Sequence, residues 1–392
     1  MKLWDKNYIL DKEIENFTVG NDYLIDKKLL KYDCIGSIAH ARMLEKINIL
    51  SKDECKDIIF QLKKIIELNE KKLFKIIKED EDCHTAIEKY LIKNLGKTGK
   101  KINTARSRND QILTALRLYY KDEIKNTEYE INKLLKTVKK FKKKYSEIEI
   151  PGYTHMKKAM PSSINIWVGY IIESFKENIK FLKFVLSYID KSPLGTAAGY
   201  GLPIKIDRDL TSEILGFKEI QKNPLHVQNS RGKYESLILH SLIQIMYDLN
   251  KISTDILFFS IDEIDIFSIP KKYCTGSSIM PHKNNFDCIE LIRAKYHLII
   301  SLENQINSVV GNLISGYNRD IQITKEPVIK AFHTTKECIK IMNLILSDLK
   351  LNKDKCKKAM NEELNATKEV YNLVKEGVSF RDAYKKIAKK YS

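Results

Sequence analysis

A ten-residue segment, Gly276 to Asn285, carries the residue types that proton abstraction beside a carboxylate requires. It reads Gly-Ser-Ser-Ile-Met-Pro-His-Lys-Asn-Asn. Glycine and proline interrupt regular structure, so the sequence predicts a shaped loop here and not a helix. Ser277 is a candidate base and Lys283 a cation within the same loop. A serine-rich connector between helices is the plainer alternative, but it does not explain why Lys283 and Asn285 follow at fixed offsets.

A histidine and a carboxylate lie one helical turn apart earlier in the chain. His84 and Glu88 belong to the stretch Asp-Cys-His-Thr-Ala-Ile-Glu. The functional interpretation is a histidine oriented by a carboxylate at an active site. The alternatives are a surface ion pair at i,i+4 and a metal site, for which the sequence places no further ligands nearby. Taken alone, the spacing favours the surface ion pair.

Two arginines alternate with small polar residues where a long helical pattern begins. The segment is Thr104 to Asp110, with sequence Thr-Ala-Arg-Ser-Arg-Asn-Asp. Arginine side chains and a helix N-terminus both bind carboxylates well. The structural alternative is a capping segment, with Ser107 or Asn109 as N-cap and the arginines solvated. The two interpretations are compatible.

Two further segments carry polar residues at breaks in the helical pattern. Pro151 to His155 is expected to form a turn just before another helix, with His155 able to move a proton or orient a carboxylate. A histidine packed in a turn is the alternative. Further on, Tyr317, Gln322 and Lys325 follow an apolar segment and can converge on a zwitterionic amino-acid group, or line a solvated helix end.

Apolar residues that recur at the helical spacing predict an all-α fold, whose helices must position these polar residues. All eight prolines lie between Pro151 and Pro327, so the flanking segments contain no helix breaker of that kind. Amphipathic helices are expected at residues 109–147, 163–190, 234–259 and 288–314. Helices this long and apolar need cover on most faces, which a bundle with further burial between subunits would supply. Strand signals are weak, and Leu202–Ile206 is at most a short hairpin arm.

Composition excludes several classes of protein. The chain has 392 residues and a formal net charge of +17, yet its lysines are spread along the sequence and no nucleic-acid-binding motif accompanies them. A basic surface that attracts an anionic metabolite fits better than nucleic acid. The apolar runs are too short to cross a bilayer. The seven cysteines form no CxxC pair, and Met1–Lys6 lacks the apolar core of a secretory signal, so a cytoplasmic protein with reduced thiols is expected.

Taken together, these segments resemble the argininosuccinate lyases of the fumarase/aspartase superfamily. The loop at Gly276–Asn285 resembles the signature that the superfamily shares. The narrower resemblance comes from the segments at His84–Glu88, Thr104–Asp110, Pro151–His155 and Tyr317–Pro327, and the similarity extends over nearly the whole chain. The resemblance implies a small helical N-terminal domain (1–107), a central long-helix bundle (108–357) and a short C-terminal helical domain (358–392). It also implies a homotetramer whose active sites are shared between subunits.

The reaction that this resemblance implies is anti elimination of fumarate from argininosuccinate, which leaves arginine. Ser277 matches the family's proposed base, His155 its second acid or base, and Lys283 the cation that stabilises the carbanion. The substrate-binding positions that match are Arg108, Asn109, Thr154, Asn285, Tyr317, Gln322 and Lys325, with His84 and Glu88 in support. The family requires no metal and no organic cofactor.

The sequence departs from the family pattern at several positions. Ala105 stands where glycine is usual, and Asn284 and Phe286 replace lysine and proline after Lys283. Arg231 begins an unusual Arg-Gly-Lys-Tyr stretch. The chain also ends short of a typical C-terminal domain. The alternatives are another lyase of the superfamily (adenylosuccinate lyase, aspartase or fumarase), a catalytically weak structural homologue and, more remotely, a basic helical binding protein.

Overall fold

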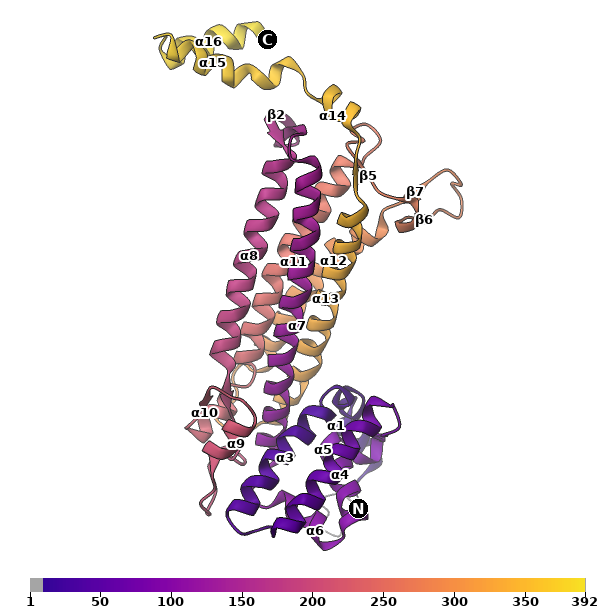
Figure 1. Ribbon diagram of the computed structural model, residues 1–392, viewed down its shortest axis with the longest axis vertical. Helices are drawn as coiled ribbons and strands as arrows, with labels where there is room; N and C mark the ends of the chain where they lie inside the picture. The colour runs from indigo at the N-terminus through magenta and orange to yellow at the C-terminus, as the bar shows by residue number, and fades with distance from the viewer. Residues whose placement is uncertain (1–9, 392) are drawn as a thin grey trace. The chain divides into compact units, whose positions relative to one another are not determined.

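The computed structural model describes residues 10–391, and its regular structure is almost entirely α-helical (Figure 1). The all-α prediction is therefore confirmed. No helix in this range is both long enough and apolar enough to span a bilayer. All seven cysteines are free thiols, as expected. Met1–Lys6, where the sequence shows no secretory signal, lies outside the described residues.

Five long helices form the framework, and segments of each contribute to two compact units. The first unit takes the residues up to 126 together with 182–240 and 302–330. The second takes 127–181, 241–301 and 331 onward. The long helices are α7 (Arg108–Tyr145), α8 (Ile164–Ile189), α11 (Lys233–Phe259), α12 (Asp287–Val309) and α13 (Lys325–Asp348). The domain limits expected after residues 107 and 357 stay a prediction.

The first unit adds short helices to its share of the long ones. They are α1 (Lys12–Val19), α2 (Asp22–Ile25), η1 (Asp26–Lys28), α3 (Leu30–Lys46), α4 (Lys52–Glu70), η2 (Lys78–Asp80), α5 (Cys83–Leu95), α6 (Lys97–Lys100), η3 (Lys101–Asn103), α9 (Arg208–Ile214), α10 (Pro224–Asn229) and η5 (Arg319–Thr324). Helix α3 packs against both α4 and α5. A capping box starts α4, where Ser51 and Glu54 each bond the other's backbone N–H.

The second unit carries the remaining short elements. Its short helices are η4 (Lys271–Tyr273), α14 (Lys353–Ala359), η6 (Glu362–Asn365), α15 (Ala366–Lys375) and α16 (Phe380–Tyr391). Helices α15 and α16 lie side by side (Figure 1), and Lys390 joins Glu369 across them at 2.9 Å. The separate C-terminal domain expected at 358–392 stays a prediction.

The strands occur only as two-stranded pairs. Strands β1 (Glu149–Thr154) and β2 (Lys157–Ser163) form an antiparallel hairpin, and β3 (Lys191–Ser192) runs parallel to β4 (Glu219–Ile220). The antiparallel pairs β5 (Phe267–Ser268) with β8 (Lys350–Leu351) and β6 (Thr275–Gly276) with β7 (Asn284–Asn285) complete the set among the described residues. No strand forms at Leu202–Ile206, so the hairpin arm suggested there is wrong.

The helices expected from periodicity match the structure with one exception. The apolar residues of α7 that recur at the helical spacing are all buried, namely Ile112, Leu116, Ile124, Ile131, Leu135, Val138 and Phe141. Helix α12 ends at Val309 and not at Ile314. Gly311 follows, and Asn312 has a φ of 60°, a left-handed conformation that a right-handed α-helix cannot continue through.

Candidate active site

The start of helix α7 presents arginine and asparagine side chains in fixed positions. The Ser107 hydroxyl accepts the Asn109 N–H at 3.3 Å, and the Ser107 N–H donates to Asp110 at 3.0 Å. Ser107 is therefore the N-cap, and Asn109 lies in the first helical turn. Ala105, just upstream, has a φ of 60°, the left-handed conformation that glycine adopts more easily.

Both arginines of this segment are anchored by the protein, so the alternative in which they are simply solvated is wrong. Arg106 donates to Ser37 at 2.8 Å and to Asn103 at 2.9 Å. Arg108 donates to Thr85 at 2.7 Å and pairs with the Glu81 carboxylate at 3.3 Å. These contacts hold the Arg108 guanidinium in a defined orientation, while part of the Arg108 side chain stays accessible to solvent.

His84 is a buried member of an ion pair, but its partner is not Glu88. Its Nδ1 lies 2.6 Å from the Asp33 carboxylate, and the His84 and Asp33 side chains are only 5% and 1% exposed. Burial favours the neutral imidazole, yet the Asp33 carboxylate raises the pKa of His84 above its ordinary value. Glu88 instead accepts a hydrogen bond from Asn103. The surface ion pair is therefore wrong, and the histidine-carboxylate pair forms with a residue of another helix.

Lys325 is almost completely buried and is held by two carboxylates. Its ammonium lies 2.8 Å from Asp26 and 2.9 Å from Asp22, with 3% of its side chain exposed. Burial works against the charge, but the two carboxylates raise the pKa of Lys325 above its usual range. Lys325 therefore stays charged, and the two aspartates fix its position.

These residues line one cavity of about 170 Å³ inside the first unit. Six predicted site residues contribute to its wall: His84, Arg108, Asn109, Tyr317, Gln322 and Lys325. Glu88 does not. The charged residues of the wall are Asp22, Asp26, Glu81, Asp82, Arg108, Arg231, Arg319 and Lys325. A wall that mixes carboxylates with cations suits a ligand that itself carries both signs of charge.

Several residues of this cavity escaped the sequence analysis. Asp22, Asp26 and Glu81 belong to no recognised motif, and no local pattern connects them with Lys325 or Arg108. Arg231 stood out only as an unusual stretch; here it lines the cavity, with its guanidinium 6.0 Å from the centre of the Tyr317 ring. Only the fold brings these residues to one place.

The loop that contains Ser277 belongs to the second unit and extends from the short β6–β7 pair (Figure 1). Asn285 donates to the Gly276 carbonyl at 3.3 Å across the base of this loop. The Ser277 hydroxyl oxygen accepts the backbone N–H groups of Ile279 at 3.3 Å and of Met280 at 3.0 Å. Lys283 is exposed. The predicted shaped loop is therefore present, and two N–H donors point at the hydroxyl oxygen of the candidate base.

Thr154 and His155 also lie in the second unit, at the tip of the β1–β2 hairpin. His155 and Met156 have φ values of 51° and 60°, which is the backbone geometry of a tight two-residue hairpin turn. Helix α8 begins only at Ile164, after the second strand. The expectation of a turn directly before a helix is therefore wrong, and the turn instead presents His155 as an exposed side chain.

Comparison with known proteins identifies the family. A protein-family model described as a lyase matches residues 10–300. An argininosuccinate lyase from Thermotoga neapolitana is 48% identical over 390 residues, which cover 100% of this chain and 98% of that protein. An argininosuccinate lyase from Bacteroides fragilis is 38% identical over 386 residues, 98% of this chain and 86% of that protein.

Solved structures show the same fold at low sequence identity. An EDDS lyase variant with bound fumarate matches with a TM-score of 0.82 at 20% identity, over 97% of this chain and 76% of that one. A class II fumarase from Schistosoma mansoni matches with a TM-score of 0.81 at 14% identity, over 95% of this chain and 91% of that one. The fold is thus that of the fumarase-like, all-α lyases. Within this class the chain belongs to the argininosuccinate lyase family.

Proposed function

We propose that this enzyme cleaves argininosuccinate to arginine and fumarate. The observation that carries the proposal is the 48% identity to an argininosuccinate lyase, which extends over the full length of the chain. The cavity of the first unit supports it, since six of the matched site residues line one wall. The enzyme would then act in arginine biosynthesis in the cytoplasm.

The proposed reaction is an anti β-elimination. A base removes the proton from the carbon beside a substrate carboxylate, and the electron pair left behind spreads onto that carboxylate. The carbon–nitrogen bond then breaks, its electron pair leaves with the guanidinium nitrogen, and an acid supplies a proton to that nitrogen. The proton removed is weakly acidic, so groups that stabilise the carbanion must contribute most of the rate.

In this mechanism Ser277 is the base and Lys283 stabilises the negative charge, with help from Asn285. The two backbone N–H groups directed at the Ser277 oxygen support this role, because donors stabilise the alkoxide more than the alcohol. The loop is exposed in the free chain, with Ile279 86% exposed, and closure over the substrate would exclude water. His155 is the proposed acid for the departing nitrogen.

The binding residues divide by the part of the substrate they would hold. Thr154, Asn109 and Arg108 are proposed to hold the succinyl carboxylates. Tyr317, Gln322 and Lys325 are proposed to hold the arginine portion, whose ammonium and carboxylate suit the mixed charges of the cavity wall. Since the ammonium of Lys325 is already shared by Asp22 and Asp26, these aspartates help to orient the ion that faces the substrate.

The proposed enzyme is a homotetramer with active sites shared between subunits. Support comes from large apolar side chains that stay exposed on the long helices of a single chain. Ile166 and Phe184 on α8 are 63% and 55% exposed, and Leu291 on α12 is 58% exposed. Apolar surface of this kind on framework helices is typical of a face that packs against another subunit.

A direct assay tests the activity. The purified protein is incubated with argininosuccinate, and fumarate is followed by its ultraviolet absorbance, with adenylosuccinate, aspartate and malate in parallel reactions. Activity is expected with argininosuccinate alone. Turnover of adenylosuccinate in its place would contradict the proposal and favour another lyase of the superfamily, and no turnover at all would favour a structural homologue.

Substitutions in the loop and the hairpin test the mechanism. Ser277→Ala is expected to abolish turnover because it removes the base, and His155→Asn to reduce it by about 10²- to 10⁴-fold, the range for loss of an acid-base group. Ser278→Ala is the matched control, since it removes the neighbouring hydroxyl from the same loop, and it should keep most of the activity. Unchanged activity in Ser277→Ala would contradict the assignment of the base.

A further inference from the structure

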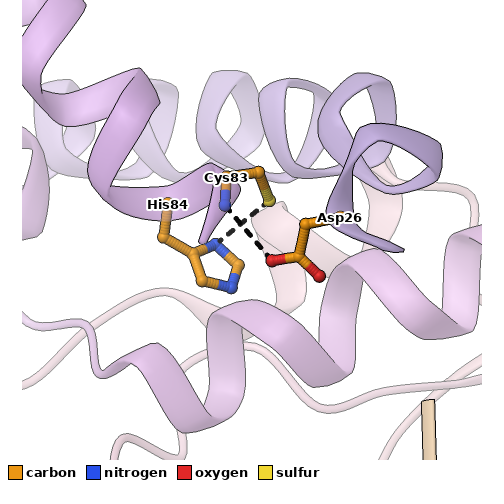
Figure 2. A group of neighbouring side chains, drawn as sticks. All are labelled: Asp26, Cys83 and His84. Carbon is orange, nitrogen blue, oxygen red and sulfur yellow. Dashed lines mark hydrogen bonds between the residues drawn. The ribbon is translucent and has the colours of Figure 1, made fainter. Parts of the chain in front are cut away.

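A cluster of side chains at the cavity of the first unit can ligate a metal ion (Figure 2). Asp26, Cys83 and His84 each offer one ligand atom, and these atoms lie within 4.8 Å of one another. Asp26 and Cys83 are 0% exposed and His84 is 5% exposed. Thiol, imidazole and carboxylate together form a donor set typical of zinc-like divalent ions.

Asp33 borders the cluster and holds His84 by a hydrogen bond. Its Oδ2 lies 2.6 Å from His84 Nδ1 and 3.6 Å from Cys83 Sγ, while Sγ and Nδ1 are 3.9 Å apart. In a tetrahedral site with bonds of about 2.0–2.3 Å, neighbouring ligand atoms lie about 3.3–3.8 Å apart. The separation of 3.9 Å between Sγ and Nδ1 is close to this range, and the upper limit of 4.8 Å for the three ligand atoms exceeds it by about 1 Å, which side-chain rotations can absorb.

The backbone holds the ligands in place before any ion binds. Asp82 caps α5, so Cys83 and His84 occupy its first turn. The Cys83 N–H donates to Asp26 Oδ2 at 3.2 Å, which ties the start of α5 to η1. Gln111 donates to one oxygen of Asp33 at 2.7 Å, and the other oxygen holds His84. Outer contacts of this kind orient metal ligands.

The charge around the cluster also suits a divalent ion. Three buried or half-buried carboxylates, Asp22, Asp26 and Asp33, face Lys325 and His84. Carboxylates around a buried cation offset part of the cost of its desolvation.

We infer that Asp26, Cys83 and His84 form a binding site for a zinc-class divalent cation, and that the ion inhibits the enzyme. Asp26 and His84 also line the cavity, which gives the ion a route to the site. An ion that takes Asp26 as ligand competes with Lys325, whose ammonium lies 2.8 Å from the same carboxylate. Lys325 would then lose the contact that fixes it in the cavity wall. The binding stands on geometry alone, while the inhibition rests on the proposed function.

Cobalt(II) provides a direct test of binding, because a cobalt–thiolate bond has a charge-transfer absorption in the near ultraviolet. The experiment uses the full-length protein with Cys274→Ser and Cys288→Ser, which removes the two partly exposed thiols. We expect binding of one cobalt ion per chain together with this absorption. Cys83→Ala should abolish the absorption and weaken binding by about tenfold or more.

Cys34→Ala is the matched control, because Cys34 is also 0% exposed and directly follows Asp33, yet its thiol is not part of the cluster. It should keep both the absorption and the affinity. Cys83→Ser serves as a second variant of nearly native size, should the alanine variant not fold, and it should also lose the absorption. An absent absorption in the parent protein, or one that survives in Cys83→Ser, would overturn the site.

Inhibition is measured separately, as turnover of argininosuccinate against added Zn²⁺. Turnover of the parent protein should fall with Zn²⁺ and return on addition of a chelator, while Cys83→Ala should need about tenfold or more Zn²⁺ for the same effect. Equal sensitivity of the two proteins would overturn the inhibitory role. Cobalt binding without any turnover would contradict the proposed function and leave the binding site standing, so the two failures are distinguishable.

Discussion

Lys325 and His84 in the first unit are buried, and neighbouring carboxylates shift the pKa of each. Asp22 and Asp26 contact Lys325 and raise its pKa, and Asp33, 2.6 Å from His84, raises the pKa of that histidine. Removal of one partner from such a pair costs about 3–5 kcal/mol, since the remaining charge stays buried without compensation. The residues that shape this cavity therefore also contribute to the stability of the unit.

His40 is the opposite case, a buried histidine that stays neutral. It is 1% exposed, and its Nε2 lies 2.9 Å from the Thr104 carbonyl, to which it donates. Burial, with the nearby Arg106 charge, lowers the pKa of His40 to about 3. The unfolded chain takes up this proton near pH 6.5. The contribution of His40 to stability is thus complete above about pH 6.5 and is lost as the pH falls toward 3.

The prediction at this scale is an acid-dependent difference between the native protein and His40→Gln. Glutamine keeps an N–H donor for the Thr104 carbonyl but does not titrate. Between pH 6.5 and 4.5 the native protein should lose about 2–3 kcal/mol more of its free energy of unfolding than the variant does. Urea denaturation at a series of pH values measures this, and parallel pH profiles would contradict the buried neutral histidine.

Helices α5 and α6 approach each other closely at Gly99. Gly99 in α6 is buried, and a Cβ atom there would lie 2.6 Å from the backbone carbon and oxygen of Leu91 in α5. Backbone atoms cannot rotate away as a flexible side chain can. The close approach of these two helices, which lie near the residues that anchor Arg106, therefore depends on glycine.

We predict that Gly99→Ala destabilises the protein by about 1–3 kcal/mol, the usual range for overpacking. Gly36→Ala in α3 is the control. Its Cβ would make an ordinary contact of 3.4 Å with Thr114, and alanine favours the helix by up to about 1 kcal/mol. Thermal unfolding of both variants measures the difference. A Gly99→Ala protein as stable as Gly36→Ala would contradict the packing of α6 on α5.

At the scale of the whole molecule, the proposed site residues are distributed over both compact units. The cavity residues belong to the first unit, while the Ser277 loop and the His155 hairpin belong to the second. The proposed tetramer would complete each active site with segments from different subunits. Such sharing has a consequence for mixed assemblies: two inactive variants can restore an intact site when their defects lie in different segments.

The prediction is that hybrid tetramers of Ser277→Ala and His155→Asn regain activity. The two inactive proteins are dissociated, mixed and reassembled, and argininosuccinate turnover is measured. Some sites of the hybrid should then combine a native Ser277 loop with a native His155 hairpin. Each variant taken alone through the same procedure is the control. Failure to regain activity in verified hybrids, or a stable active monomer in sedimentation, would contradict the shared site.

The sequence by itself determined the elements and their chemistry. Apolar residues at the helical period predicted four of the long helices, because burial of one face fixes that spacing locally. Glycine, proline and the capping residue Ser107 marked where helices start and stop, and the loop at Gly276–Asn285 formed as expected. Local spacing did not predict the hairpin at His155, because its strands show no clear alternation of apolar and polar residues.

Only the tertiary structure decided which charges meet. Asp33 is 51 residues from His84, and Asp26 is 299 residues from Lys325, so no local pattern could pair them. Local spacing paired His84 with Glu88, whereas the packing of α3 against α5 placed Asp33 at the histidine. Electrostatic partners are chosen by distance in space and by burial, and both are properties of the folded chain.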